Sequence, residues 1–268
     1  MKFKIIFILF NVVILFSFLI IFFMPLAMLG WEYTRDFWVG NWYLPLIFLL
    51  VMAVLNTYFL RNWKLFSLLE KEEWGGIIGY VLERMRRGVI RRSEVKIGIN
   101  AALVSSRVEV IGEIEQAIRD HKPALMKEFA LSLGIPRLLR NEPAEAESYY
   151  REFLELESKE KPWIIWSYGF ALLLQRKLEE AKVQFLSLSS TKEPVLLLLS
   201  AYMLDTCAAG DDEAKQRGQG MAESLRSRYD RAGLQKEADK AKTQIHVVIL
   251  SKVVDEALDW LYPAGAVS

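Results

Sequence analysis

Residue types that usually carry enzyme chemistry are scarce in this chain. Its 268 residues include one cysteine, Cys207, and two histidines, His121 and His246. A single cysteine excludes an internal disulfide and any metal site built from several cysteines. The wide spacing of the histidines excludes a helical His-Glu-x-x-His motif, and no Gly-x-Ser-x-Gly elbow occurs. We therefore expect no catalytic residues, no metal ligands, no cofactor and no enzymatic activity.

An excess of charge of one sign is missing from the chain as a whole, whose net charge is +1. Residues 61–96 contain nine Lys or Arg against five Asp or Glu, whereas residues 97–268 contain 22 against 26. A nucleic-acid-binding domain normally carries a basic stripe on the domain itself. The acidic balance after residue 96 therefore argues against a nucleic-acid partner.

Two long stretches, residues 5–31 and 37–60, contain no charged residue. Each exceeds the roughly 20 apolar residues that a helix needs to cross a bilayer. We expect a transmembrane hairpin over residues 1–62, with helices at about 5–29 and 42–60, and Pro25 should kink or end the first helix. A signal peptide is the alternative for the first stretch. That stretch is longer than the roughly 7–15 apolar residues of a signal sequence, and no small-x-small cleavage site is evident.

The segment between the two stretches, residues 30–43, is rich in aromatic residues and too short to fold on its own. Aromatic rings prefer the headgroup level of a membrane, and an aromatic ligand site is the alternative. Asn56 lies inside the second stretch. We expect it either to hydrogen-bond across the hairpin or to lie at the membrane interface.

Basic residues at the ends of the hairpin set its expected orientation. They are Lys2, Lys4, Arg61 and Lys64, against Arg35 in the joining segment. The positive-inside rule then places the N-terminus and the C-terminal Ser268 in the cytoplasm. We expect an integral protein of a bacterial inner membrane.

A basic juxtamembrane linker follows at residues 63–96. Helical spacing of apolar residues predicts a helix over 65–87 that breaks or bends near Gly75-Gly76. The end of this linker holds a cluster of basic residues, and such a cluster can contact anionic lipid headgroups. The alternative is that it is only a topology signal on a solvated helix face. The candidate headgroup contacts are Arg84, Arg86, Arg87, Arg91 and Arg92.

The most informative stretch is 131–188, where one pattern occurs twice at a spacing of 35 residues. Each copy has a small residue midway along a first helix, then an alanine and an aromatic residue four apart on a second helix. These residues are Gly134, Ala146 and Tyr150, and then Gly169, Ala181 and Phe185. The stretch resembles a pair of tetratricopeptide repeats, at residues 127–161 and 162–195. The resemblance implies an all-α protein in which antiparallel helix pairs form a solenoid over residues 97–268.

Weaker units are expected on both sides of these repeats. Residues 94–120 supply two helices without the signature, and a third unit begins at residue 194. That unit has Ala214 in place but Gly218 where the aromatic residue should be. Residues 222–261 should hold two helices separated at Gly233. The last helix would cap the array, since the final interface would otherwise face water; a free partner-binding helix is the alternative.

The resemblance implies a membrane-anchored scaffold or adaptor that binds another protein and catalyses nothing. In such repeats, exposed positions of the leading helices line the groove where a partner binds. The candidate groove residues are Arg137, Arg140, Ser167 and Gln175, and the two arginines favour a partner with an acidic segment. The alternative function is an accessory or assembly subunit of a membrane complex, in which the hairpin makes the specific contact. The pattern leaves the oligomeric state open.

Overall fold

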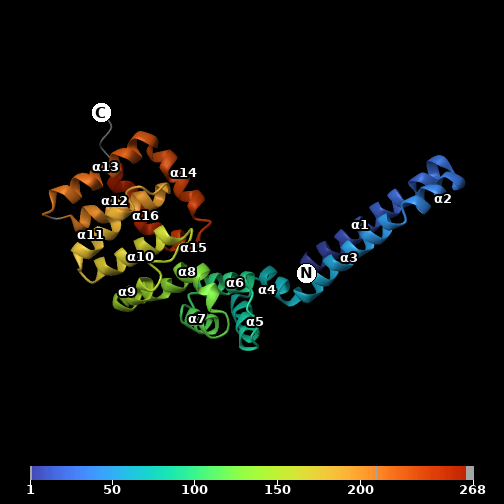
Figure 1. The fold of residues 1–268 in the computed structure, drawn as a ribbon, viewed down its shortest axis with the longest axis horizontal. Helices are drawn as coiled ribbons and strands as arrows, with labels where there is room; N and C mark the ends of the chain where they lie inside the picture. The colour runs from blue at the N-terminus through green and yellow to red at the C-terminus, as the bar shows by residue number, and fades with distance from the viewer. Residues whose placement is uncertain (1, 209, 264–268) are drawn as a thin grey trace. The chain divides into compact units, whose positions relative to one another are not determined.

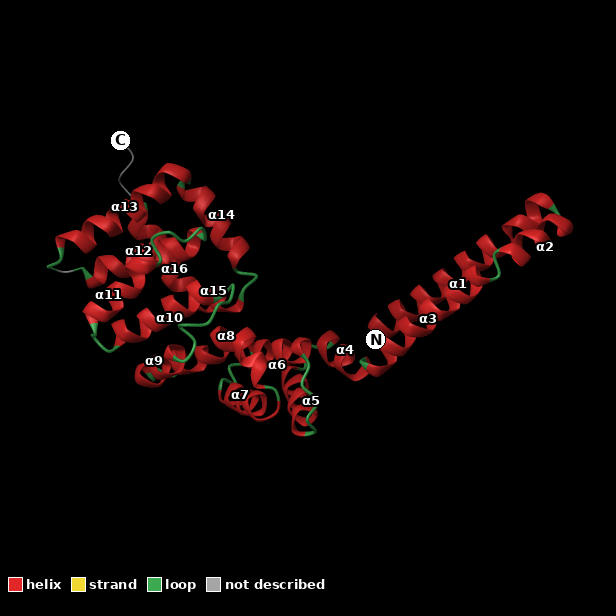
Figure 2. Ribbon diagram, in the orientation of Figure 1, coloured by secondary structure: helices red, strands yellow, loops and turns green. Residues whose placement is uncertain are grey.

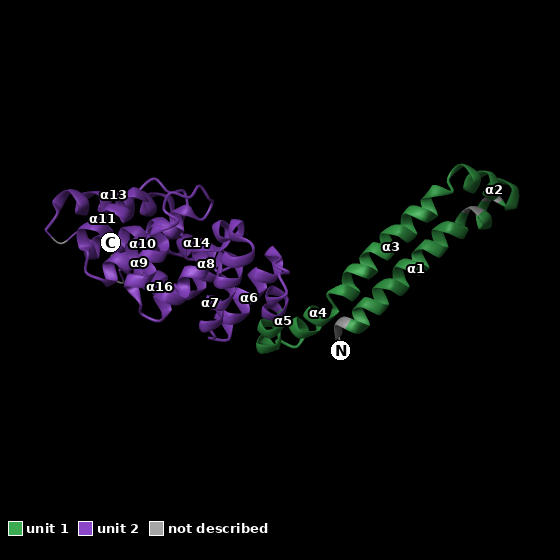
Figure 3. Ribbon diagram, turned by 60° about the horizontal axis from the view of Figure 1, so that its bottom comes forward, with its two compact units in different colours: residues 1–80 green, residues 81–268 purple. Residues whose placement is uncertain are grey.

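A computed structural model describes residues 2–208 and 210–263 of the chain (Figure 1). Those residues form α-helices and one 3₁₀ turn, without a strand among them (Figure 2). The predicted all-α class is therefore confirmed. The chain divides into two compact units, residues 1–80 and 81–268 (Figure 3). The expected basic linker, residues 63–96, is shared between these units.

The first unit contains the two long apolar helices. Its helices are α1 (Lys2–Leu29), α2 (Trp31–Gly40), α3 (Tyr43–Arg61), α4 (Trp63–Glu70) and the first half of α5 (Trp74–Arg86). Helices α1 and α3 are long and apolar enough to cross a membrane, at Lys4–Met24 and Tyr43–Arg61. Helix α1 runs past Pro25 to Leu29, so that proline does not end it. The joining segment, expected to be too short to fold, forms α2.

Aromatic rings and one pair of amides connect α1 to α3. The rings of Phe18 and Phe48 stack with their centroids 4.1 Å apart, and those of Phe7 and Phe59 are 5.3 Å apart. Asn56 Nδ2 donates a hydrogen bond to Asn11 Oδ1 at 2.9 Å. The bond across the hairpin that was one of two expectations for Asn56 is therefore present.

The second unit is a succession of helices. They are the end of α5, α6 (Arg92–Val104), α7 (Glu109–His121), α8 (Met126–Leu139), α9 (Pro143–Arg151), α10 (Lys161–Leu174), α11 (Leu178–Ser187), α12 (Pro194–Cys207), α13 (Asp212–Arg228), α14 (Arg231–Ala241), α15 (Ile245–Ile249) and α16 (Ser251–Leu261). Each helix from α6 to α13 contacts the next one along the chain. We call α6, α8, α10 and α12 the leading helices and α7, α9, α11 and α13 the return helices. Neighbouring leading helices also touch each other, as do α11 and α13.

A left-handed backbone turn recurs through the helical region at spacings of 34 or 35 residues. It follows every second helix from α4 to α12, at Glu72, Ser106, Asn141, Arg176 and Gly210, with φ between 54° and 87°, and a further left-handed residue, Gly88, follows α5. In the first four turns, the residue after the left-handed one donates its backbone N–H to a carbonyl oxygen five residues earlier. This bond gives a hydrogen-bond partner to a carbonyl group in the last turn of the helix. The same turn therefore joins α4 to α5, α6 to α7, and each later leading helix to its return helix.

Glycines let the paired helices approach closely. A Cβ atom on Gly134 would overlap the ring of Tyr150, and one on Gly169 would lie 3.1 Å from Cε1 of Phe185. Both aromatic residues are fully buried. Gly98 of α6 has a similar relation to Ile114 of α7, at 3.3 Å. The weak unit over residues 94–120 thus uses the same contact with a branched aliphatic side chain in place of an aromatic ring.

Several expected helix boundaries are wrong. The break after α4 falls at residues 71–73, because the left-handed turn at Glu72 ends that helix, and Gly75-Gly76 lie in the first turn of α5, which begins at Trp74. Gly233 does not separate two helices. It lies in the first turn of α14, where its N–H binds the capping side chain of Asp230 at 2.7 Å.

The C-terminal stretch also differs from expectation, because it forms two helices, α15 and α16, where one was expected. Helix α16 packs against α12 and α14, and α15 packs against α8. Val254, Ala257, Leu258 and Leu261 of α16 are buried. This stretch is therefore part of the packed unit and not a free helix.

Candidate partner-binding face

The leading helices carry two of the four predicted groove residues, Arg137 and Ser167, and the other two, Arg140 and Gln175, directly follow α8 and α10. In the structure, three of the four make polar contacts within the protein, and the fourth, Ser167, is buried. Arg137 donates to Glu115 Oε2 at 2.9 Å, and its guanidinium lies 4.2 Å from the centroid of the Tyr149 ring. Arg140 is exposed and pairs with Glu142 at 2.9 Å. Both arginines thus already have a carboxylate partner, and an acidic ligand would compete with it.

Ser167 and Gln175 are not exposed positions, contrary to the argument that selected them. Ser167 is only 5% exposed. Gln175 is half-buried, and its Nε2 donates to Glu147 Oε2 at 2.8 Å and to the Pro143 carbonyl oxygen at 3.1 Å. The four residues therefore do not form one surface. Their predicted role in binding stays a prediction.

Sequence reasoning missed the polar contacts that join neighbouring helix pairs. Glu147 of α9 is buried and accepts from Lys177 Nζ at 2.6 Å, and it also contacts Arg151. The hydrogen bond from Lys177 lowers the pKa of Glu147, with Gln175 adding to this effect. The next interface has the charges reversed, because Lys182 of α11 donates to Asp211 Oδ2 at 2.5 Å. Glu147 and Lys182 are 35 residues apart, so the two pairs occupy corresponding places in the repeat.

The C-terminal segment covers part of the leading-helix face. A cavity of about 190 Å³ lies between α8, α10 and this segment, lined by Trp166, Ser167 and His246 among mostly apolar residues. The His246 ring lies 4.5 Å from that of Trp163, and burial lowers the pKa of His246 to about 4. The imidazole is therefore neutral at pH 7, and the groove positions around Ser167 are occupied by the chain itself.

A polar pocket of about 230 Å³ lies beside this cavity, and residues 243–246 of the C-terminal segment form one of its walls. Its walls include Lys96 and Asn100 of α6, Glu128 and Ser132 of α8, and Glu160. Burial raises the pKa of Glu160, while the charge of Lys96 opposes that shift. The Glu160 side chain makes no hydrogen bond with another residue that the structure describes. This pocket, beside the leading helices, thus contains a carboxylate that accepts no hydrogen bond from another described residue.

Each of the five candidate lipid-contacting arginines has a carboxylate partner. The pairs are Arg84–Glu94 at 2.9 Å, Arg86–Glu113 at 3.2 Å, Arg87–Glu83 at 2.5 Å, Arg91–Glu94 at 3.7 Å and Arg92–Glu128 at 2.8 Å. Glu94 is 3% exposed, so its pairs are structural contacts. The others lie at the surface, where ion pairs exchange readily with solvent. Contact with headgroups stays a prediction. An anionic headgroup would compete with the carboxylate that already pairs with each arginine.

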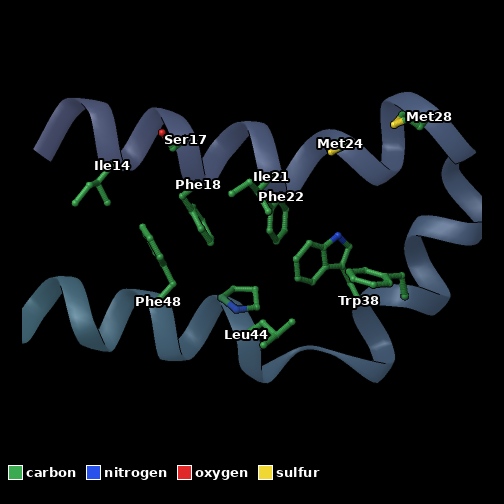
Figure 4. Close-up of a pocket in the computed structure, with 12 residues that line it drawn as sticks. Ile14, Ser17, Phe18, Ile21, Phe22, Met24, Met28, Trp38, Leu44 and Phe48 are labelled. Carbon is green, nitrogen blue, oxygen red and sulfur yellow. The ribbon is translucent and has the colours of Figure 1, made fainter. Parts of the chain in front are cut away.

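An apolar groove of about 640 Å³ runs between α1, α3 and α2 in the first unit. Figure 4 shows Phe18 and Phe22 of α1 facing Phe48 of α3, with Trp38 of α2 closing one end. The rings of Phe22 and Trp38 stack with their centroids 4.4 Å apart. A groove with such walls suits hydrocarbon.

Groups that could perform chemistry stay apart. Among residues 2–208 and 210–263, no three His, Cys, Asp or Glu side chains form a group that could hold a metal ion. Burial raises the pKa of Cys207 to about 11, so its thiol is protonated at pH 7. The described residues thus form an all-α protein with two long apolar helices and a repeat-like succession of helix pairs.

The chain belongs to a family described as an uncharacterised Treponema protein, which matches residues 110–263. That match covers α8 to α16 and nearly all of α7. A protein of Treponema pallidum strain Nichols, described as an uncharacterized protein, is 24% identical over 281 residues. The alignment covers 98% of this chain and 88% of that relative, so it includes both long apolar helices. No solved structure matches the chain.

Proposed function

We propose that this protein is a membrane-anchored scaffold whose tetratricopeptide-like solenoid recruits a protein partner and performs no catalytic step. The observation that carries the proposal is the left-handed turn that recurs every 34 or 35 residues from Glu72 to Gly210. Tetratricopeptide repeats have a period of 34 residues, and stacked helix pairs leave an extended face for partners. The glycine–aromatic contacts at Gly134 and Gly169 support the same assignment.

Two observations support a membrane anchor. Large apolar side chains of α1 and α3 are exposed along their whole length, for example Ile6 at 61% and Leu50 at 63%. A patch of this size would be costly in water. The hydrogen bond and ring contacts between α1 and α3 favour an α1 that is retained, against a cleaved signal peptide. The excess of basic residues at the hairpin ends favours a cytoplasmic solenoid on a bacterial inner membrane. Ser268, which was predicted to lie in the cytoplasm, is outside the described residues.

Cysteine labelling tests the anchor and its orientation. Gly40→Cys in a Cys207→Ser background should react with a membrane-impermeant maleimide on intact cells. A Cβ atom at Gly40 has no neighbour within 4 Å, so the change is tolerated. A cysteine at exposed Ser227, on α13, should react only after the cells are opened. The reverse pattern, or a mature N-terminus near Gly30, would refute this arrangement.

We place partner binding at the polar pocket between α6, α8 and Glu160. An acidic partner remains the expectation from Arg137 and Arg140, but such a partner must displace Glu115 and Glu142. In the pocket, Glu160 requires no displacement, whereas Glu128 is paired with Arg92. A scaffold that used this pocket would bind a partner through hydrogen-bond donors, because Glu160 presents a carboxylate there.

Two arginine substitutions test the location. Ser132→Arg puts a long side chain into the pocket, whereas Ser227→Arg adds the same charge on the exposed surface of α13. Affinity purification of the full chain with mass spectrometry should show co-purifying proteins that Ser132→Arg loses and Ser227→Arg keeps. Arg137→Glu tests the acidic-partner alternative in the same experiment. Identical sets of proteins for all variants would refute binding at this face.

The second candidate function is an accessory subunit of a membrane complex, and the apolar groove between α1, α3 and α2 favours it. Exchanging the hairpin for an unrelated two-helix anchor separates the two candidates. A scaffold keeps its partners after the exchange, whereas an accessory subunit loses them.

A further inference from the structure

The two asparagines that join α1 to α3 leave part of their hydrogen-bonding capacity unused. Each amide has two N–H donors and an oxygen with two acceptor sites. Asn56 uses both donors, one to Asn11 Oδ1 and one to the Met52 carbonyl oxygen, each at 2.9 Å. Asn11 uses one donor, to the Phe7 carbonyl oxygen at 2.9 Å. Within the described chain, Asn56 Oδ1 accepts no hydrogen bond and one N–H of Asn11 has no acceptor.

These unused groups lie inside the apolar spans. Asn11 is seven residues from the start of the first span and Asn56 is five residues from the end of the second. At about 1.5 Å per residue, they are about 10 Å and about 8 Å from the ends of their spans. In hydrocarbon there is no water to complete their hydrogen bonds. Both side chains are half-exposed, so another helix can reach them from the side of the hairpin.

We propose that a second copy of this chain completes these bonds and that the protein is a dimer in the membrane. The unused set is self-complementary, because one copy offers an N–H on Asn11 and an oxygen on Asn56. In a two-fold arrangement, Asn11 of each copy donates to Asn56 of the other, which forms two equivalent bonds. Lipid acyl chains could cover the apolar surface but could not supply either group. This inference rests on the proposed membrane insertion.

Single-molecule photobleaching in lipid vesicles tests the dimer. The full chain carries one fluorophore at Gly40→Cys in the Cys207→Ser background and is reconstituted in phosphatidylcholine at decreasing protein-to-lipid ratios. Two bleaching steps should dominate at high ratios and give way to one step on dilution. Asn11→Leu and Asn56→Leu should each move this midpoint to a protein density on the order of tenfold higher, as expected for lost hydrogen bonds between membrane helices.

A matched variant separates this effect from a general loss of polarity. Asn41→Leu removes an asparagine whose Nδ2 donates to the Phe37 carbonyl oxygen at 2.8 Å, outside both spans, and it should leave the midpoint unchanged. The hairpin itself should survive Asn56→Leu, because the Phe18–Phe48 and Phe7–Phe59 contacts lie on either side of the lost bond. Maleimide labelling of Gly40→Cys on intact cells checks this for every variant.

The outcomes distinguish this inference from the proposed function. A chain that labels correctly but bleaches in one step at all ratios refutes the dimer and leaves the membrane scaffold intact. Midpoints that the Asn11 and Asn56 variants do not move also refute it, and a majority of spots with more than two steps refutes the two-fold arrangement. A chain without an inserted hairpin refutes both.

Discussion

Replacing Gly134 with alanine is expected to destabilise the packing of α8 against α9, through the contact between Gly134 and Tyr150. A Cβ atom at this position would lie 2.6 Å from Cε1 and 2.5 Å from the hydroxyl oxygen of Tyr150. The ring cannot move aside freely, because Tyr150 is fully buried and its hydroxyl donates to the Leu131 carbonyl oxygen at 3.2 Å. Either α8 and α9 separate or the tyrosine loses this bond.

The magnitude follows from three effects. Overpacking a core by one methyl group costs about 1–3 kcal/mol. A buried hydrogen bond that is lost adds about 1 kcal/mol. Alanine is a better helix former than glycine by about 1 kcal/mol, which offsets part of the cost. We expect the free energy of unfolding to fall by about 1–3 kcal/mol.

Urea unfolding of the full chain in detergent, followed by far-UV circular dichroism, measures this change. The control is Gly112→Ala in α7, where a Cβ atom meets nothing within 4 Å. That variant should be as stable as the native protein or more stable by up to about 1 kcal/mol. Adding Tyr150→Phe to Gly134→Ala should recover part of the loss, because the overlapped hydroxyl is removed. If Gly134→Ala is as stable as Gly112→Ala, the glycine does not determine the approach of these helices.

Two further predictions concern pH. The lowered pKa of Glu147 stabilises the folded protein above the unfolded pKa of about 4.3, and this stabilisation is lost as the pH falls through the folded pKa. Below about pH 4.3, the urea midpoint should therefore fall more steeply for the native protein than for Glu147→Gln. The pKa of His246, lowered to about 4 by burial, acts at higher pH. Between about pH 6.5 and 4 the unfolded state binds the extra proton, so the free energy of unfolding should fall by up to about 3 kcal/mol, and His246→Phe should abolish that fall. Equal pH profiles for native protein and variant would contradict either prediction.

Local patterns in the sequence were enough to predict the secondary structure of much of the chain. The uncharged stretches predicted α1 and α3 because crossing a bilayer requires length and apolarity, which are properties of the residues themselves. The spacing of Gly134, Ala146 and Tyr150 predicted the close approach of α8 and α9 for a similar reason. These residues lie within one helix pair, so the contact depends on few residues that are near in sequence.

The recurring left-handed turn extends beyond the residue signature, to the ends of α4 and α6, whose sequences lack that signature. Glu72, Ser106 and Arg176 are not residues that favour a left-handed conformation, so nothing in their identity marks a turn. The packing of each helix pair imposes the conformation. Because the turn is set by geometry and the aromatic residue is replaceable, α6 and α7 keep the arrangement with Ile114 at the contact.

The polar contacts and the covered face were decided by tertiary structure alone. Glu147 meets Lys177 across 30 residues, and Arg137 meets Glu115 across 22, so no local pattern could pair them. Ser167 looked exposed because it lies on a leading helix, but α15 and α16, about 80 residues later, fold back over that helix. Burial depends on what the rest of the chain places against a residue. For this protein the local sequence therefore determined most of the helices, and the tertiary structure determined which of their side chains remain exposed.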